Sequence, residues 1–163
     1  MEGGPVFLTH AGSFTFGSSE IDSDAGYAFR GRVRYGFGII SVAGEIQESS
    51  QNYGMPPTPS APQNLSATFL GATAAVHPFK LAGIAPYGEI GLGKLFFKDQ
   101  SISTDQGSTA AIYGIGVGIG LSGRIGLDVG FRLVRLGNLT AQGVATQFDY
   151  DPKEVSVLLS FKL

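Results

Sequence analysis

The segment at residues 109–121 constrains the fold more than any other part of the chain, because its apolar residues alternate with glycine. On a β-strand, successive side chains point to opposite sides of the sheet. Glycine would then fill one face at positions 114, 116, 118 and 120. The other face would be apolar, with Tyr113, Ile115, Val117, Ile119 and Leu121. The segment is therefore predicted to be a strand with one apolar face and one nearly bare face.

The same period-two alternation recurs along the whole chain. Residues 25–36, for example, place an arginine row opposite an aromatic row. Marking every such segment predicts eight strands, at residues 5–17, 25–36, 39–49, 65–76, 84–97, 109–121, 125–136 and 153–163. Segment 65–76 is placed by its position, since neither of its faces is clearly apolar. Each strand is about the 9–11 residues that a tilted strand needs to cross a bilayer.

The connections between these segments alternate between short and long. No apolar run is long enough for a transmembrane helix, so any membrane must be crossed by strands. An even number of strands can close into a barrel with no unpaired edge, with short turns in the periplasm and long loops outside. We therefore predict an all-β protein, an eight-stranded antiparallel up-and-down transmembrane β-barrel that forms one domain over residues 1–163.

The two faces of the strands predict which side meets lipid. A soluble lipocalin-like barrel would point its apolar face inward, and this is the alternative architecture. The interior of eight strands is only just wide enough for side chains, so the aromatic and aliphatic rows would overfill it. Many of the 25 glycines would instead make room there for long neighbouring side chains. We expect glycine and charge inside and aliphatic side chains against lipid.

Aromatic residues are expected to form a girdle at each membrane interface. By simple alternation His10 faces outward with Val6 and Leu8, unless a bulge turns it inward. The girdle residues are Tyr35, Phe37, Tyr87 and Phe161 near the short turns, and Phe14, Phe16, Tyr27, Phe96 and Tyr113 near the long loops.

The inward positions collect charges of both signs, and charges confined in a narrow lumen must be paired. A tight turn near Phe37 and Gly38 would put Arg30 across from Glu45, and one near Gly123 would put Asp128 across from Gly118. An ion pathway is the alternative interpretation. The predicted lumenal charge network is Arg30, Arg32, Arg34, Glu45, Glu89, Asp128, Arg132 and Glu154.

Other kinds of site find little support in the sequence. A net charge of −2 with scattered charges gives no footprint for nucleic acid. With no cysteine and two histidines we expect no metal site. The glycine pattern GIGLSG, which resembles a dinucleotide-binding motif, lies inside a strand rather than before a helix, so we expect no cofactor. The first residues do not resemble a signal peptide, and we expect that one preceded this sequence.

Three segments carry a family resemblance: TAAIYGIGVGIGLSGRIGLDVGFRLVR, HPFKLAGIAPYGEIGLG and the alternating C-terminal strand. In these the chain resembles the small outer-membrane barrels of the OmpA/OmpX-like superfamily, which implies a bacterial outer-membrane location. Some barrels of this size modify lipid A, and the deacylase type carries His and then Ser two residues later near the outer end of its seventh strand. Here Arg135 and Gly137 stand in that region, so we expect no enzyme activity.

A structural or surface-binding role through the long outer loops is therefore the expected function. The alternatives are a small-solute channel or transporter, then a lipid A-modifying enzyme or a soluble barrel. Membrane lipid is the expected partner, a surface ligand is possible through the loops, and we expect a monomer. The candidate loop contacts are Tyr53, Met55, Pro56 and Pro57, in a Pro-rich connection.

Overall fold

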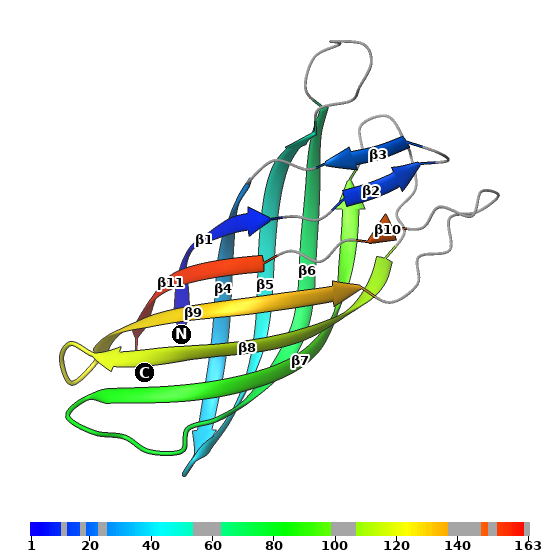
Figure 1. Cartoon of the computed structure of the whole chain (residues 1–163). Coiled ribbons are helices and arrows are strands. Elements are labelled where there is room, and N and C mark those ends of the chain that lie inside the picture. Colours follow the sequence, from blue (N-terminus) through cyan, green and yellow to red (C-terminus); the bar gives the residue numbers. More distant parts are fainter. Residues whose placement is uncertain are drawn as a thin grey trace.

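The structure is a computed structural model that describes residues 1–10, 13–16, 19–22, 26–53, 63–98, 107–136, 148–149 and 153–161. Eight antiparallel strands close into a barrel in the order β1-β11-β9-β8-β7-β6-β5-β4, which confirms the predicted fold class (Figure 1). Their bounds are β1 Glu2–His10, β4 Gly26–Phe37, β5 Ile40–Tyr53, β6 Gln63–Val76, β7 Ile84–Lys98, β8 Gly107–Gly120, β9 Ile125–Leu136 and β11 Lys153–Phe161.

A second, smaller sheet lies at the end of the barrel opposite the termini (Figure 1). It consists of β2 (Ser13–Phe16), β3 (Ser19–Asp22) and β10 (Phe148–Asp149), in the order β10-β2-β3. The single strand predicted at 5–17 is therefore wrong in extent, because the barrel strand ends at His10 and residues 13–16 pair elsewhere. The pairing of β1 with β11 becomes irregular between Leu8 and His10, which interrupts the ladder at this point.

The turn between β4 and β5 sets the register of the arginine row. Phe37 pairs with Ile40, so the loop is Gly38 and Ile39, and Gly38 has a φ of 63°. A two-residue hairpin favours glycine at a first loop position with positive φ. The predicted turn was centred one residue too early. Arg30 consequently pairs with Gln47, and it is Arg32 that lies across from Glu45.

The outer wall of the barrel is apolar, as the sequence predicted. Tyr27, Phe29, Tyr35 and Phe37 on β4 are all more than half exposed, and Ile115 on β8 is 66% exposed. Similar side chains cover the other strands. A surface of this kind is stable against lipid rather than water.

Two residues face the opposite way from their predictions. Val6 is fully buried and points inward, so the outward face predicted for Val6 is wrong. The side chain of His10 lies outside the described ones. Tyr87, predicted in a girdle, is only 4% exposed. The period-two rule itself places Tyr87 on the same face as Glu89, which is inward.

Both chain ends lie at the barrel end that carries the short turns (Figure 1). The backbone nitrogen of Met1 donates to the oxygen of Phe161 at 2.7 Å, and the nitrogen of Phe161 donates back to Met1 at 2.7 Å. The short turns are at residues 38–39, 77–83 and 121–124, whereas the long connections leave from the other end. Among the described residues, no helix is long and apolar enough to span a membrane.

Candidate functional site

The lumen is the part of the barrel in which polar chemistry is concentrated. Arg30, Arg32 and Arg132 are at most 2% exposed, and their carboxylate partners are buried with them. The side chains come from β1, β4, β5, β7, β9 and β11, so the network crosses the interior rather than following one hairpin. A charge in such a place is stable only when it is paired and hydrogen-bonded.

Arg132 on β9 is the centre of the largest cluster. Its Nη1 and Nη2 donate to the two carboxylate oxygens of Glu45 at 2.7 and 3.0 Å, and its Nε donates to Glu89. The bidentate geometry matches the planar guanidinium to the carboxylate. Arg32 lies between the same two acids, with nitrogen to oxygen distances of 3.3 Å to Glu45 and 3.7 Å to Glu89.

Arg30 on β4 belongs to a second cluster. Its Nε donates to Gln47 Oε1 at 2.8 Å, and its Nη2 donates to Glu154. The amide of Gln47 in turn donates to the other oxygen of Glu154 at 2.7 Å. Three side chains from three strands thus form a closed ring of hydrogen bonds, which fixes their orientation.

A third cluster lies nearer the periplasmic end. Arg34 reaches Glu2 at 3.4 Å and Asp128 at 3.5 Å, and its guanidinium lies 5.1 Å from the ring centre of Tyr87. The Tyr87 hydroxyl donates to Asp128 at 2.7 Å. Glu2 also pairs with Arg32 at 3.3 Å, which joins this cluster to the one around Arg132.

Glycines leave the space that these long side chains occupy. A Cβ at Gly114 would lie 2.8 Å from Glu89 Oε1 and 2.9 Å from Arg132 Cγ, both too close. A Cβ at Gly116 would overlap the phenol of Tyr87, and one at Gly130 would lie 3.0 Å from its hydroxyl. The glycine face of β8 is therefore occupied at Gly114 and Gly116 by side chains from the neighbouring strands.

Beyond the charge network, toward the outer end, the interior becomes apolar. The inward side chains there are 0–6% exposed, and a Cβ at Gly71 or Gly93 would overlap the Phe69 ring. A cavity lies between the two layers, bordered by Gln47 and Arg132 on one side and Phe69 on the other, with room for about one water. The apolar layer consists of Ala67, Phe69, Leu95, Ala110, Ile112 and Val134.

The eight residues named from the sequence all point into the lumen, with Arg34 the least buried of them. The specific pairing of Arg30 with Glu45 is wrong. The strand register pairs Arg30 with Gln47, and the Arg30 guanidinium donates to Glu154. Asp128 does lie across from Gly118. Sequence reasoning missed Glu2, Gln47 and Tyr87, although alternation along β5 and β7 places the last two on the inward face. It also missed the apolar layer.

The candidate loop contacts lie at and beyond the outer end of β5. Tyr53 is the last residue of β5 and pairs with Gln63 of β6. Met55, Pro56 and Pro57 lie outside the described residues.

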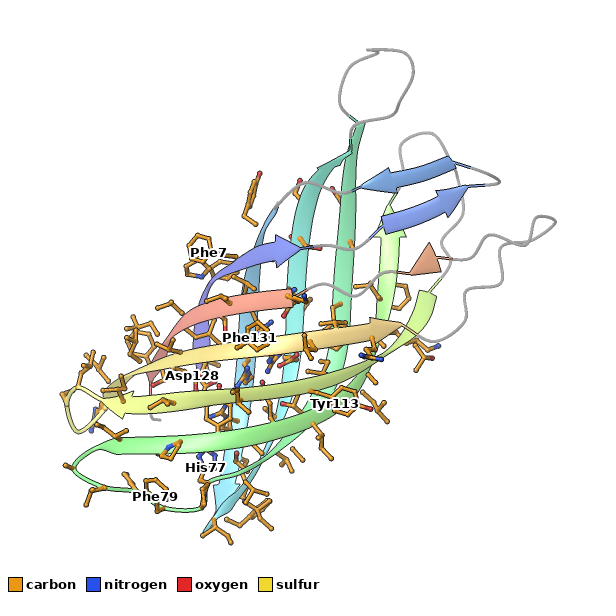
Figure 2. All side chains as sticks on the ribbon, in the orientation of Figure 1. Phe7, His77, Phe79, Tyr113, Asp128 and Phe131 are labelled. Carbon is orange, nitrogen blue, oxygen red and sulfur yellow. The ribbon has the colours of Figure 1, made fainter. Side chains whose placement is uncertain are left out.

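One serine and histidine pair lies at the periplasmic mouth of the lumen. Ser41 Oγ and His77 Nε2 are 2.9 Å apart, and His77 lies beside Tyr87 with ring centres 5.5 Å apart (Figure 2). Burial and the nearby Arg34 lower the pKa of His77, which favours the neutral imidazole. Ser41 is only 3% exposed, and the described interactions include no carboxylate bonded to His77. The pair joins the beginning of β5 to the turn that follows β6.

Comparison with known proteins agrees with this architecture. Neisserial surface protein A superposes with a TM-score of 0.72 at 18% identity, over 99% of this chain and 96% of that one. Ail, the attachment invasion locus protein of Yersinia pestis, in complex with the heparin analogue sucrose octasulfate, gives a TM-score of 0.52 at 16% identity, over 98% and 97%. A search of the curated proteins finds no match.

The sequence profile of a bacterial envelope family matches nearly all of the barrel. The match covers residues 6–161 and therefore includes seven barrel strands in full and most of β1. With the apolar outer wall and the closed strand order, it places the protein in the bacterial outer membrane. The chain belongs to the family of the outer membrane protein beta-barrel domain.

Proposed function

We propose that this protein is a closed, non-enzymatic barrel that holds surface-binding loops at the outer face of the membrane. The observation that carries the proposal is the filled lumen. A solute would have to pass a layer of paired charges and then a layer of apolar side chains. The cavity between these layers has room for about one water.

The outer end of the barrel supports the surface role. The pairing of β5 with β6 continues to Tyr53 and Gln63, whereas the pairing of β5 with β4 stops at Ser50 and Tyr27. This hairpin therefore extends past its neighbour, and the sheet formed by β2, β3 and β10 adds structure at the same end (Figure 1). A rigid scaffold that carries long loops is typical of recognition proteins. Tyr53, Met55, Pro56 and Pro57 remain the proposed loop contacts.

The charge of the loops favours one kind of surface ligand. Residues 11–25, 54–62, 99–106 and 137–152 contain seven Asp and Glu and no Lys or Arg. An acidic surface attracts basic or neutral partners and repels polyanions. The Ail structure contains a heparin analogue, but the acidic loops of this chain disfavour a sulfated ligand. We expect the loops to bind a neutral or basic surface.

Conductance in planar lipid bilayers tests the closed lumen. Purified protein should insert without producing a large, steady current, because ions cannot cross the apolar layer. A stable pore of nanosiemens size would contradict the proposal and favour the channel alternative. Retention on immobilised heparin at physiological salt tests the loop charge separately. We expect no retention, and strong retention would show that the ligand class is wrong.

A further inference from the structure

The three short turns, which follow β4, β6 and β8, form one rim at the periplasmic end of the barrel. The nitrogen of His77 donates to the oxygen of Ile39 at 2.7 Å, which joins the turn after β6 to the turn after β4. The nitrogen of Gly120 donates to the oxygen of Gly83 at 2.7 Å, so the turns after β6 and β8 lie side by side (Figure 1). Side chains on the three turns therefore share one surface.

Backbone hydrogen bonds hold the turn after β6 at its tip. Leu81 and Ile84 exchange two of them, at 2.9 and 2.8 Å, around Ala82 and Gly83. These two residues have φ values of 49° and 85°, and a two-residue hairpin turn of type I′ requires positive φ at both positions. The side chain of Leu81 is therefore held at a fixed place on the rim, with Lys80 next to it.

Large apolar side chains are exposed on this rim. Phe79 and Leu81 are 60% and 72% exposed, and Figure 2 shows Phe79 on the turn after β6. Ile39 and Leu121, on the two neighbouring turns, are also exposed. Such side chains are more stable against lipid than against water.

The charge of the rim is positive. Lys80 and Arg124 are exposed, and the turns at 38–39, 77–83 and 121–124 contain no Asp or Glu. In the part of the chain that the structure describes, neither cation forms an ion pair with a carboxylate. The long loops at the opposite end contain only acids. The two ends of the barrel therefore attract partners of opposite charge.

The outer wall indicates how deep the rim lies in the membrane. Among the described outward side chains of the barrel strands, charge occurs only toward the outer end, and Lys94 and Arg135 mark this limit on β7 and β9. The same two strands begin about ten residues earlier, at Ile84 and Ile125. A tilted strand crosses the hydrocarbon in about that length. The rim therefore lies at the level of the headgroups of the inner leaflet.

We propose that the periplasmic rim binds an anionic phospholipid of the inner leaflet. Lys80 stands between Phe79 and Leu81, so its ammonium reaches a lipid phosphate while the two apolar side chains enter the acyl boundary. Arg124, on the adjacent turn, binds phosphate through charge-assisted hydrogen bonds. A zwitterionic headgroup carries its own cation, so the rim favours phosphatidylglycerol over phosphatidylcholine. The rim consists of Ile39, Phe79, Lys80, Leu81, Leu121 and Arg124.

The test is a titration with phosphatidylglycerol, and phosphatidylcholine with the same acyl chains is the zwitterionic reference. Protein refolded in zwitterionic detergent is mixed with each lipid, and bound lipid is counted by native mass spectrometry. Lys80→Gln/Arg124→Gln should bind phosphatidylglycerol about tenfold more weakly than the unmodified chain, because each cation near an anionic surface strengthens binding. Its binding of phosphatidylcholine should be unchanged.

Three further variants separate charge, position and apolar contact. Lys80→Arg/Arg124→Lys keeps both charges and should keep the preference for phosphatidylglycerol. Lys94→Gln/Arg135→Gln removes the same charge from the outer ends of β7 and β9, and most of the phosphatidylglycerol binding should remain. Phe79→Ser changes no charge and should weaken binding of the whole lipid, because its ring no longer enters the acyl boundary.

Three outcomes would overturn the proposal. The first is an equal loss of phosphatidylglycerol binding in Lys80→Gln/Arg124→Gln and Lys94→Gln/Arg135→Gln, and the second is unchanged binding in Phe79→Ser. The third is displacement of phosphatidylglycerol by excess inorganic phosphate, because the rim would then take a free anion rather than a lipid. Mobility in SDS before and after heating checks that each variant is folded, and the single variants Lys80→Gln and Arg124→Gln serve if the double variant does not fold.

Discussion

The lumen is filled in two different ways, by paired charges toward the short turns and by apolar side chains toward the outer end. The periplasmic layer is held by ion pairs such as Arg132 with Glu45, and the outer layer by contacts such as Phe69 over Gly71 and Gly93. Buried ion pairs often add little stability compared with apolar packing of equal volume, but a buried charge that loses its partner is expensive. We therefore expect the charge layer to favour one arrangement of the strands and the apolar layer to contribute stability through packing.

The largest expected effect comes from removing the centre of the charge layer. Arg132→Met leaves Glu45 and Glu89 to share Arg32, so the free energy of unfolding should fall by about 3–5 kcal/mol. Urea unfolding in detergent or in vesicles measures it. Arg135→Met, on the same strand but facing outward, is the control and should cost less than about 1 kcal/mol. Equal losses for the two variants would mean that the ion pairs of Arg132 in the lumen do not contribute to the free energy of unfolding.

Truncation in the apolar layer should have the next largest effect. Phe69→Ala removes a ring that is 4% exposed and leaves a cavity beside Gly71 and Gly93, which should cost about 3 kcal/mol. Neither this loss nor that of Arg132→Met should change much with salt, because Phe69 is uncharged and the ion pairs of Arg132 are buried and weakly screened. Leu70→Ala, the exposed neighbour, should cost clearly less in the same urea titration. A loss at Phe69 as small as that at Leu70 would contradict the packed apolar layer.

Adding one carbon tests the space between strands and should have the smallest effect. Gly114→Ala places a methyl group against Glu89 and Arg132 and should destabilise the barrel by roughly 1–3 kcal/mol. Gly44→Ala is the control, since a Cβ there meets nothing within 4 Å. Parallel urea titrations compare the two. If Gly114→Ala leaves the free energy of unfolding unchanged, the side chains of Glu89 and Arg132 must be able to move away from the added methyl group.

The sequence was enough to predict the barrel because alternation of side chains is a local property. Residues 109–121 and 125–136 needed only the period of two to assign both strand and face. The lumenal arginines followed from the same rule. The glycine face of β8 also showed in advance that neighbouring side chains would enter the interior.

Features that depend on exact register or on depth could not be obtained in this way. Arg30 was matched with Glu45 because a one-residue error in the turn changes every pair along the hairpin. Ile112 and Val134 are residue types that also face lipid, so the apolar layer was overlooked, although alternation with Gly114 and Arg132 places both on the inward face. Tyr87 was misplaced because its residue type was weighed above its alternation with Glu89. The bond between Arg30 and Glu154 joins strands that are not sequence neighbours.

The pairing of the two chain ends sets an order for folding. Met1 and Phe161 are 160 residues apart in sequence, yet their backbones are hydrogen-bonded to each other. The seam between β1 and β11 is thus the most non-local contact of the barrel, and such contacts form late because their loop-closure entropy must be overcome first. Until β11 reaches the membrane, β1 and β9 each keep an unpaired edge. Folding and insertion should accordingly be concerted, with the last nine-residue strand completing both.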